Sequence, residues 1–218
     1  MTEQTAPGVG SAEQIVTPSG AADRRQARTR AVVLWGVAIL VFAVAGAWIL
    51  GGLNPSLASS GISWQDPAFV EEPADSAFDD EESTFTVWDL DTGAKTSVVV
   101  QNDRPYPITV SPGPASPATQ VEIAAMDSPP SGLISPDLLT TSAQLDVPAG
   151  GYIVVIMQVT DRCMQMMAGS AAGNDVAIVE VTTFGITRSL EVQFPATYMA
   201  GTTSGHGADP ACSPAFSD

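Results

Sequence analysis

The segment DVAIVEVTTFGITRSLEVQF, residues 175–194, is the part of the sequence that most clearly indicates the fold. Two runs rich in β-branched and aromatic residues, 175–184 and 188–194, lie on either side of Gly185, which suits a tight turn between strands. From Leu190 to Phe194 every second side chain is apolar, so one face of this run should be buried and the other hydrated. We therefore predict a β-hairpin here.

The same pattern of short strands and turn residues extends back from this hairpin to Thr84. The run YIVVIMQVT, residues 152–160, is apolar on both faces, as expected for a central strand. Further strands are expected at 84–90, 95–101, 106–110, 120–126 and 143–147, the first two joined as a hairpin through Asp91-Thr92-Gly93. No helix is expected among them. The pattern predicts an all-β fold, an antiparallel immunoglobulin-like β-sandwich of about 7–8 strands.

A different kind of segment precedes the strands. Residues 31–53, AVVLWGVAILVFAVAGAWILGGL, carry no charge and would form a helix of about 34 Å, enough to cross a hydrocarbon core of about 30 Å. Trp35 and Trp48 lie near its ends, where indole rings favour the membrane interface. Four arginines within 24–30 precede it and should remain in the cytoplasm. We predict a single-pass plasma-membrane anchor with a cytoplasmic N-terminus; a cleaved secretory signal, usually with a shorter apolar core, is the alternative.

These segments predict four regions. Residues 1–30 are expected to be a disordered cytoplasmic tail, because they are polar and lack periodicity. Residues 31–53 are the transmembrane helix, and residues 54–83 form an acidic flexible stalk with several prolines. A calcium loop is the alternative for this acidic run, but the glycine and alternating oxygen ligands of such a loop are missing. Residues 84–218 form the extracytoplasmic β-sandwich.

Charge limits the partners. The chain has a formal net charge of −16, and half of its eight basic residues precede the apolar segment. Beyond residue 30 no cluster of Lys and Arg offers a phosphate-binding surface, so nucleic acid is not an expected partner. The membrane is the expected partner, together with another envelope or membrane protein.

Cys163 and Cys212 are the two cysteines of the chain. Outside the cytoplasm they can form a single intrachain disulfide, which on the chain-entropy model would stabilise the fold by at most about 4 kcal/mol. Its role would be to hold the Gly/Ser/Thr-rich C-terminal segment. A redox role is the alternative, but redox cysteines are usually closely spaced.

The Met-rich segment after Cys163 suggests a second chemistry. Met164, Met166 and His206 combine thioether and imidazole ligands that could hold Cu(I). The simpler interpretation is that these methionines fill space at one end of the sandwich, because no sustained metal-ligand spacing is visible. We therefore predict no metal and no cofactor, with the copper set as the alternative.

An enzyme is not expected. The sequence has no Gly-x-Ser-x-Gly motif, and His206, the one histidine, lies between two glycines in the C-terminal segment rather than on a rigid element. No catalytic residue is predicted.

Four short segments share a recognisable pattern: Asn102-Asp103 and Pro107–Val110 within QNDRPYPITV (101–110), the corner Pro148–Gly151, and the strand end Thr160–Cys163. In this pattern, over roughly residues 84–214, the chain resembles a group of uncharacterised actinobacterial membrane-anchored proteins. The resemblance implies the sandwich fold, the anchor and the disulfide, and it implies no activity. The Met-rich segment departs from that group. The sequence thus predicts a membrane-tethered, non-enzymatic binding or accessory module at the cell surface, with extracytoplasmic copper handling as the alternative.

Overall fold

The computed structural model describes residues 19–72, 83–90, 92–126, 128 and 135–209. The chain divides into two compact units, Met1–Ala47 and Trp48–Asp218.

Most of the first unit that the structure describes is helical. Helix α1 spans Ser19–Leu53, and its segment Val32–Gly51 has a mean hydropathy of 2.5 with none of it buried. This length and composition suffice to cross a membrane, so the helix is a candidate membrane anchor or signal sequence. The prediction of a disordered tail up to residue 30 is wrong from Ser19 onward, because the Ala-, Arg- and Gln-rich run before the apolar segment favours helix. Residues 1–18 lie outside the described residues.

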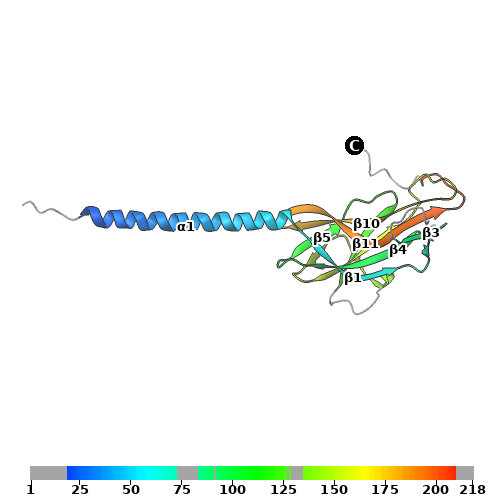
Figure 1. The fold of residues 1–218 in the computed structure, drawn as a ribbon, viewed down its shortest axis with the longest axis horizontal. Helices are drawn as coiled ribbons and strands as arrows, with labels where there is room; N and C mark the ends of the chain where they lie inside the picture. The colour runs from blue at the N-terminus through cyan, green and yellow to red at the C-terminus, as the bar shows by residue number, and fades with distance from the viewer. Residues whose placement is uncertain (1–18, 73–82, 91, 127, 129–134, 210–218) are drawn as a thin grey trace, which may run out of the picture. The chain divides into compact units, whose positions relative to one another are not determined.

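The second unit contains two β-sheets, and the predicted all-β sandwich is confirmed (Figure 1). The five-stranded sheet has the order β1 (Leu57–Gln65), β4 (Ala94–Asn102), β9 (Tyr152–Val159), β6 (Thr119–Met126) and β7 (Thr141–Ser142). The six-stranded sheet has the order β2 (Val70–Glu71), β3 (Thr84–Trp88), β11 (Ile186–Thr202), β10 (Ser170–Thr183), β5 (Ile108–Pro112) and β8 (Leu145–Val147). A single 3₁₀ turn, η1 (Pro136–Leu138), precedes β7 among the described residues. All strand pairs are antiparallel except β3 with β11, which are parallel.

Strand β9 occupies the centre of its sheet, as its apolar sequence predicted. One face, represented by Ile153, Val155 and Met157, joins the main core between the two sheets. The other face, Val154 and Ile156, forms a smaller cluster on the outer side of the sheet. Because both faces of β9 are covered, its residues from 153 to 157 are all buried.

The β10–β11 hairpin is also confirmed. Thr183 pairs with Ile186, so Phe184 and Gly185 form a two-residue loop. Both have positive φ angles, 51° and 80°, as a type I′ turn requires. Strand β11 then continues to Thr202, well beyond the run expected from sequence.

Two expectations are wrong. Strands β3 and β4 do not form a hairpin, because β3 pairs with β2 and β11 whereas β4 pairs with β1 and β9 in the other sheet. The flexible stalk over 54–83 is wrong for residues 57–72, because β1 lies along β4 and β2 along β3. The acidic residues between 73 and 82 lie outside the described residues.

Candidate functional site

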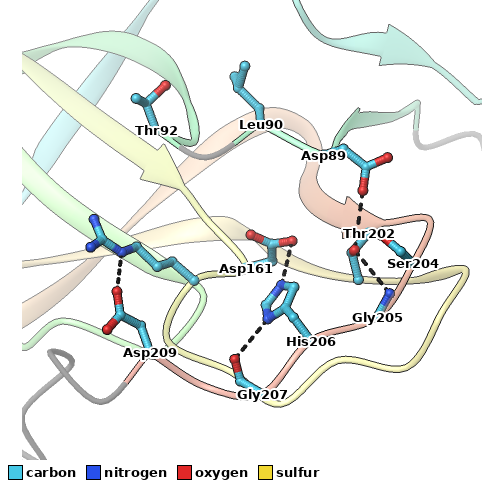
Figure 2. A pocket seen from close by; sticks show the side chains of 11 residues that line it. Asp89, Leu90, Thr92, Asp161, Thr202, Ser204, Gly205, His206, Gly207 and Asp209 are labelled. Carbon is cyan, nitrogen blue, oxygen red and sulfur yellow. Dashed lines mark hydrogen bonds and ion pairs between the residues drawn. The ribbon is translucent and has the colours of Figure 1, made fainter.

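A cavity of about 670 Å³ opens at one end of the sandwich, where β3, β9 and β11 end and β4 begins (Figure 2). The chain enters the sandwich at the opposite end, since the first residue of β1, Leu57, pairs with the last of β4, Asn102. The residues that line the cavity are mostly polar: Asp89, Leu90, Thr92, Asp161, Arg162, Thr202, Ser204, Gly205, His206, Gly207 and Asp209. We refer to it as the end pocket.

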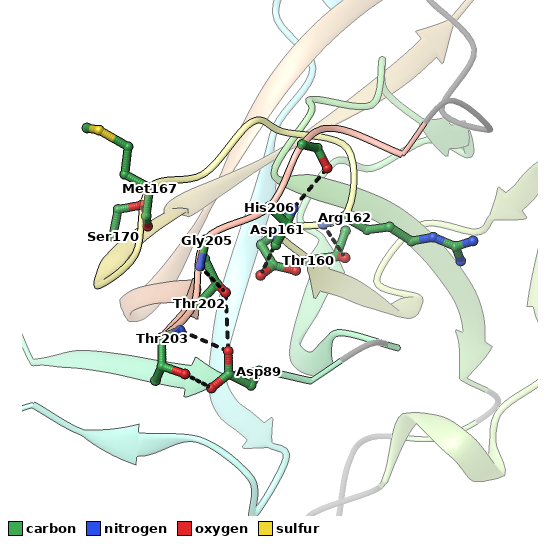
Figure 3. Close-up of polar contacts among 11 residues, drawn as sticks. Asp89, Thr160, Asp161, Arg162, Met167, Ser170, Thr202, Thr203, Gly205 and His206 are labelled. Atoms are coloured by element: carbon green, nitrogen blue, oxygen red, sulfur yellow. Dashed lines mark hydrogen bonds and ion pairs between the residues drawn. The ribbon is translucent and has the colours of Figure 1, made fainter.

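Asp89 forms one wall of the end pocket, directly after β3. Its φ angle is 52°, a left-handed conformation that Asp tolerates better than most residues. Its amide donates to the Gly201 carbonyl at 2.9 Å, and its carboxylate accepts from the Thr202 hydroxyl at 3.2 Å and from the Thr203 amide and hydroxyl at 2.9 and 2.5 Å (Figure 3). The hydrogen bonds from Thr203 lower the pKa of Asp89, so this carboxylate stays ionised. Asp89 therefore ties the end of β3 to the end of β11.

Asp161 and His206 form the opposite wall. Asp161 follows β9 and is 8% exposed, and its Oδ2 lies 2.9 Å from His206 Nε2. The other ring nitrogen, Nδ1, lies 3.0 Å from the Gly207 carbonyl oxygen. A carbonyl oxygen only accepts hydrogen bonds, and so does an ionised carboxylate, so both contacts are satisfied together when both ring nitrogens carry protons. The hydrogen bond with Asp161, followed by that with Gly207, raises the pKa of His206.

The backbone holds this histidine in place. The Met166 amide donates to the His206 carbonyl at 2.9 Å, and the His206 amide donates to the Met166 carbonyl at 3.0 Å, which forms an isolated antiparallel bridge. Met166 is buried at 8% exposure and His206 is half-buried. The C-terminal segment around His206 is therefore joined to the loop after β9 rather than extending freely from the sandwich.

Arg162 lies at the rim. Its Nε donates to Asp209 Oδ2 at 2.5 Å, and the Asp209 amide donates to the Arg162 carbonyl at 2.9 Å. The arginine side chain is 62% exposed, so the rest of its guanidinium remains open to solvent. A planar guanidinium in this position can recognise a carboxylate or phosphate oxygen.

The arrangement suits binding of a polar molecule. The end pocket offers hydroxyl groups, carboxylates and one exposed guanidinium, and hydrogen bonds hold Asp89, Asp161 and Arg162 in place. Among the described residues, no group of three or more His, Cys, Asp and Glu could hold a metal ion. The pocket can therefore supply hydrogen bonds and charge to a ligand that enters from solvent.

No family model matches the chain, and no curated protein is significantly similar to it in sequence.

The residues predicted from sequence belong to two sets, the disulfide pair and the copper set. Cys163 is half-buried in the loop after β9, whereas Cys212 lies outside the described residues, so the disulfide stays a prediction. Of the copper set, Met166 and His206 are brought together by the backbone bridge. Met164 lies in the turn of the same loop, and its backbone amide donates to the backbone carbonyl of Asp161. Both ring nitrogens of His206 already have partners, so a metal would have to displace one of them.

Sequence reasoning did not identify Asp89, Asp161 or Arg162 as pocket residues. A usable signal was present in Thr160–Cys163, where two charged residues directly follow a buried strand. For Asp89 the signal was weaker, because an acidic residue after a strand is common in turns.

Proposed function

We propose that this protein is a membrane-tethered, non-enzymatic binding or accessory module that engages a ligand or partner protein through the end pocket. Its N-terminus lies in the cytoplasm and its sandwich lies outside the plasma membrane. The observation that carries the proposal is that the end pocket and the entry of the chain lie at opposite ends of the sandwich.

This separation favours presentation of the pocket away from the anchor. Leu53, the last residue of α1, is followed after only three residues by β1. Strand β1 pairs with β4 from Asn102 to Thr96, a length of about 20 Å, and runs toward the end where Gln65 pairs with Thr96. A pocket beyond that end is accessible to a partner in the surrounding medium.

The composition of the pocket supports binding rather than catalysis. His206, the one imidazole of the chain, is hydrogen bonded at both ring nitrogens, so neither is poised to take a proton from a nucleophile. Thr202 and Asp89 are likewise engaged in hydrogen bonds that fix the pocket wall. Rigid polar groups of this kind provide orientation and specificity for a ligand.

A crosslinking experiment in intact cells tests the proposal. A photoreactive amino acid is placed at Ser204, which is exposed in the pocket, and as a matched control at Leu138, which is 82% exposed on η1. We expect a discrete adduct from position 204 that excess unlabelled chain competes away, and no such adduct from position 138. Equal labelling at the two positions would contradict the assignment of the pocket.

The topology has its own test. A cysteine at Ser204 should react with a membrane-impermeant maleimide in intact cells, whereas one at Ser11 should be protected. The reversed pattern would contradict the orientation, and a soluble form starting near Leu53 would show that the apolar segment is a cleaved signal.

Copper handling is the second candidate, favoured by one observation. The bridge between Met166 and His206 places two of the three suggested ligands opposite each other on two antiparallel loop segments. Directly opposed residues of an antiparallel pair project to the same side, so a thioether and an imidazole could converge there. Such binding would require the imidazole to give up its contact with Asp161 or Gly207.

A further inference from the structure

The end of the sandwich where the chain enters is confined to the neighbourhood of the apolar helix by chain length alone. From Leu53 of α1 to Leu57 of β1 the chain has four peptide steps, which span at most about 14 Å when fully extended. This end of the sandwich therefore lies close to Gly51, the last residue of the candidate membrane span, which belongs to the same compact unit.

An exposed aromatic side chain lies at this same end. Phe184 occupies the tip of the β10–β11 hairpin and is 39% exposed. Its φ angle is 51°, a conformation that costs energy for a bulky side chain, and two-residue hairpin loops prefer Asn, Asp or Gly at this position. Turn formation alone therefore does not account for a phenylalanine here.

Phe184 belongs to a small aromatic group. Its ring centroid lies 4.9 Å from that of Tyr106, which is in the loop that follows Asn102. The second compact unit begins at Trp48, and the Trp48 ring centroid lies 6.3 Å from Phe184. Within the same unit the Tyr106 hydroxyl donates to the Gly51 carbonyl at 3.3 Å. The last turns of the apolar helix thus end among these rings.

We infer that Phe184 and Tyr106 form a contact surface for the lipid bilayer, with their rings in the interfacial layer at the level of Trp48. Aromatic side chains favour this layer because they combine an apolar body with polarisable or hydrogen-bonding edges. The surface would add a second point of attachment to the single helix and hold the sandwich with its end pocket directed away from the membrane. This inference rests on the proposed membrane anchor.

The test uses the full-length chain reconstituted into phosphatidylcholine vesicles. Phe184→Cys and, at the other end of the sandwich, Met167→Cys are each labelled with an environment-sensitive fluorophore without reduction of the native cysteines. Met167 is a matched control because it is 80% exposed. We expect lipids spin-labelled near the headgroup to quench the fluorophore at position 184 several-fold more than that at position 167.

A second reporter keeps the test informative if replacement of Phe184 disturbs the turn. Thr187→Cys places the fluorophore at an exposed position on the same hairpin, and we expect quenching between the other two values. Weak and equal quenching at 184, 187 and 167 in a chain that co-floats with the vesicles would overturn the lipid contact alone. A chain that fails to co-float with vesicles would overturn the proposed anchor, and the contact with it.

Discussion

Met166 and His206 exchange two backbone hydrogen bonds, of 2.9 and 3.0 Å, and so join the loop after β9 to the segment after β11. The same loop supplies Asp161, whose carboxylate lies 2.9 Å from the His206 ring. A backbone bridge and a side-chain ion pair thus hold the same two segments together, and the ion pair depends on the protonation of one imidazole.

This dependence predicts a specific response to pH. Because the pKa of His206 is raised above its ordinary value of 6.5, its contribution to stability is complete below pH 6.5 and is lost as pH rises through the higher folded-state pKa. His206 is the only histidine, so its ring protons can be followed by NMR without ambiguity. We expect a midpoint above 6.5, and a thermal unfolding temperature that falls over the same pH range.

Asp161→Asn is the matched variant for this titration, since it keeps the shape of the side chain but removes the charge. We expect the His206 midpoint to move down toward 6.5, because the largest cause of the raised pKa is removed and the hydrogen bond with Gly207 and the weaker influence of Asp89 remain. A wild-type midpoint at or below 6.5 would contradict the ion pair.

Asn102→Ala is expected to destabilise the sandwich. Asn102 is fully buried, and its side-chain amide donates to the carbonyl oxygens of Tyr106, Val147 and Pro148 at 2.9, 3.3 and 3.0 Å. Its loss removes these hydrogen bonds from a buried to partly buried site, at a cost of about 3 kcal/mol. For a domain of this size the melting temperature should fall by roughly 10 °C.

The control for this variant is Gln101→Ala. Gln101 makes one exposed hydrogen bond to the neighbouring corner, from Nε2 to the Gly150 carbonyl at 3.0 Å, so its loss should change stability by less than about 1 kcal/mol. An equal fall in melting temperature for the two variants would show that the buried Asn102 amide does not stabilise the corner at Pro148–Gly151.

Gly173→Ala should also destabilise the fold. A Cβ at Gly173 would meet the Tyr198 carbonyl oxygen and lie 2.6 Å from the Met199 Cα, both in the backbone of β11. A backbone cannot move aside as a side chain can, so we expect a loss of about 1–3 kcal/mol in denaturant unfolding. Gly207→Ala is the control, because nothing lies within 4 Å of the position that its Cβ would occupy. A similar loss of unfolding free energy in both variants would argue against the β10–β11 register.

The disulfide prediction is tested by mass spectrometry of unreduced protein. We expect a linked pair of peptides that contain Cys163 and Cys212. Replacing both cysteines with serine should reduce stability by up to about 4 kcal/mol. Two unmodified thiols in protein isolated from the envelope would contradict the predicted disulfide. The backbone hydrogen bonds between Met166 and His206 would then be a main attachment of the C-terminal segment.

Copper binding gives a further discriminating measurement. Because both nitrogens of His206 are engaged, we expect Cu(I) to leave the melting temperature of the full-length chain unchanged. A ligand that binds only the folded state and is present at a free concentration of 100 times its Kd would add about 2.7 kcal/mol to the free energy of unfolding. This gain would raise the melting temperature by several degrees. A Cu(I)-dependent rise that disappears in Met166→Leu and His206→Gln variants would favour the second candidate function.

The sequence predicted the elements whose own residues decide their structure. Strand β9 is apolar on both faces, and the β10–β11 hairpin carries a strict alternation and a turn glycine, so both could be recognised locally. Strand β1 could not, because LASSGISWQ has no regular alternation of apolar residues and none of its side chains is fully buried. It is held mainly by pairing with β4 and by contacts such as the Ser60 hydroxyl donating to the Val99 carbonyl at 2.9 Å.

The candidate site was predictable only in part. His206 and Met166 drew attention by residue type, and the structure brings them together. Asp89 and Asp161 matter because β3, β9 and β11 end at the same place, and that depends on pairings between strands distant in sequence. A turn signal after β3 suggested a hairpin with β4, whereas β3 pairs with the end of β11 on one side and with β2 on the other.

The parallel pairing of β3 with residues 197–201 of β11 has a consequence for how the protein is made. The six-stranded sheet cannot form completely until residues 197–201 have been synthesised. Strand β3, which is made much earlier, therefore stays unpaired on that edge until then. Contacts between residues so distant in the chain slow folding. During this interval the edge of β3 and residues 170–174 of β10 are exposed to wrong pairing, so chains terminated before residue 197 should aggregate rather than fold as shorter sandwiches.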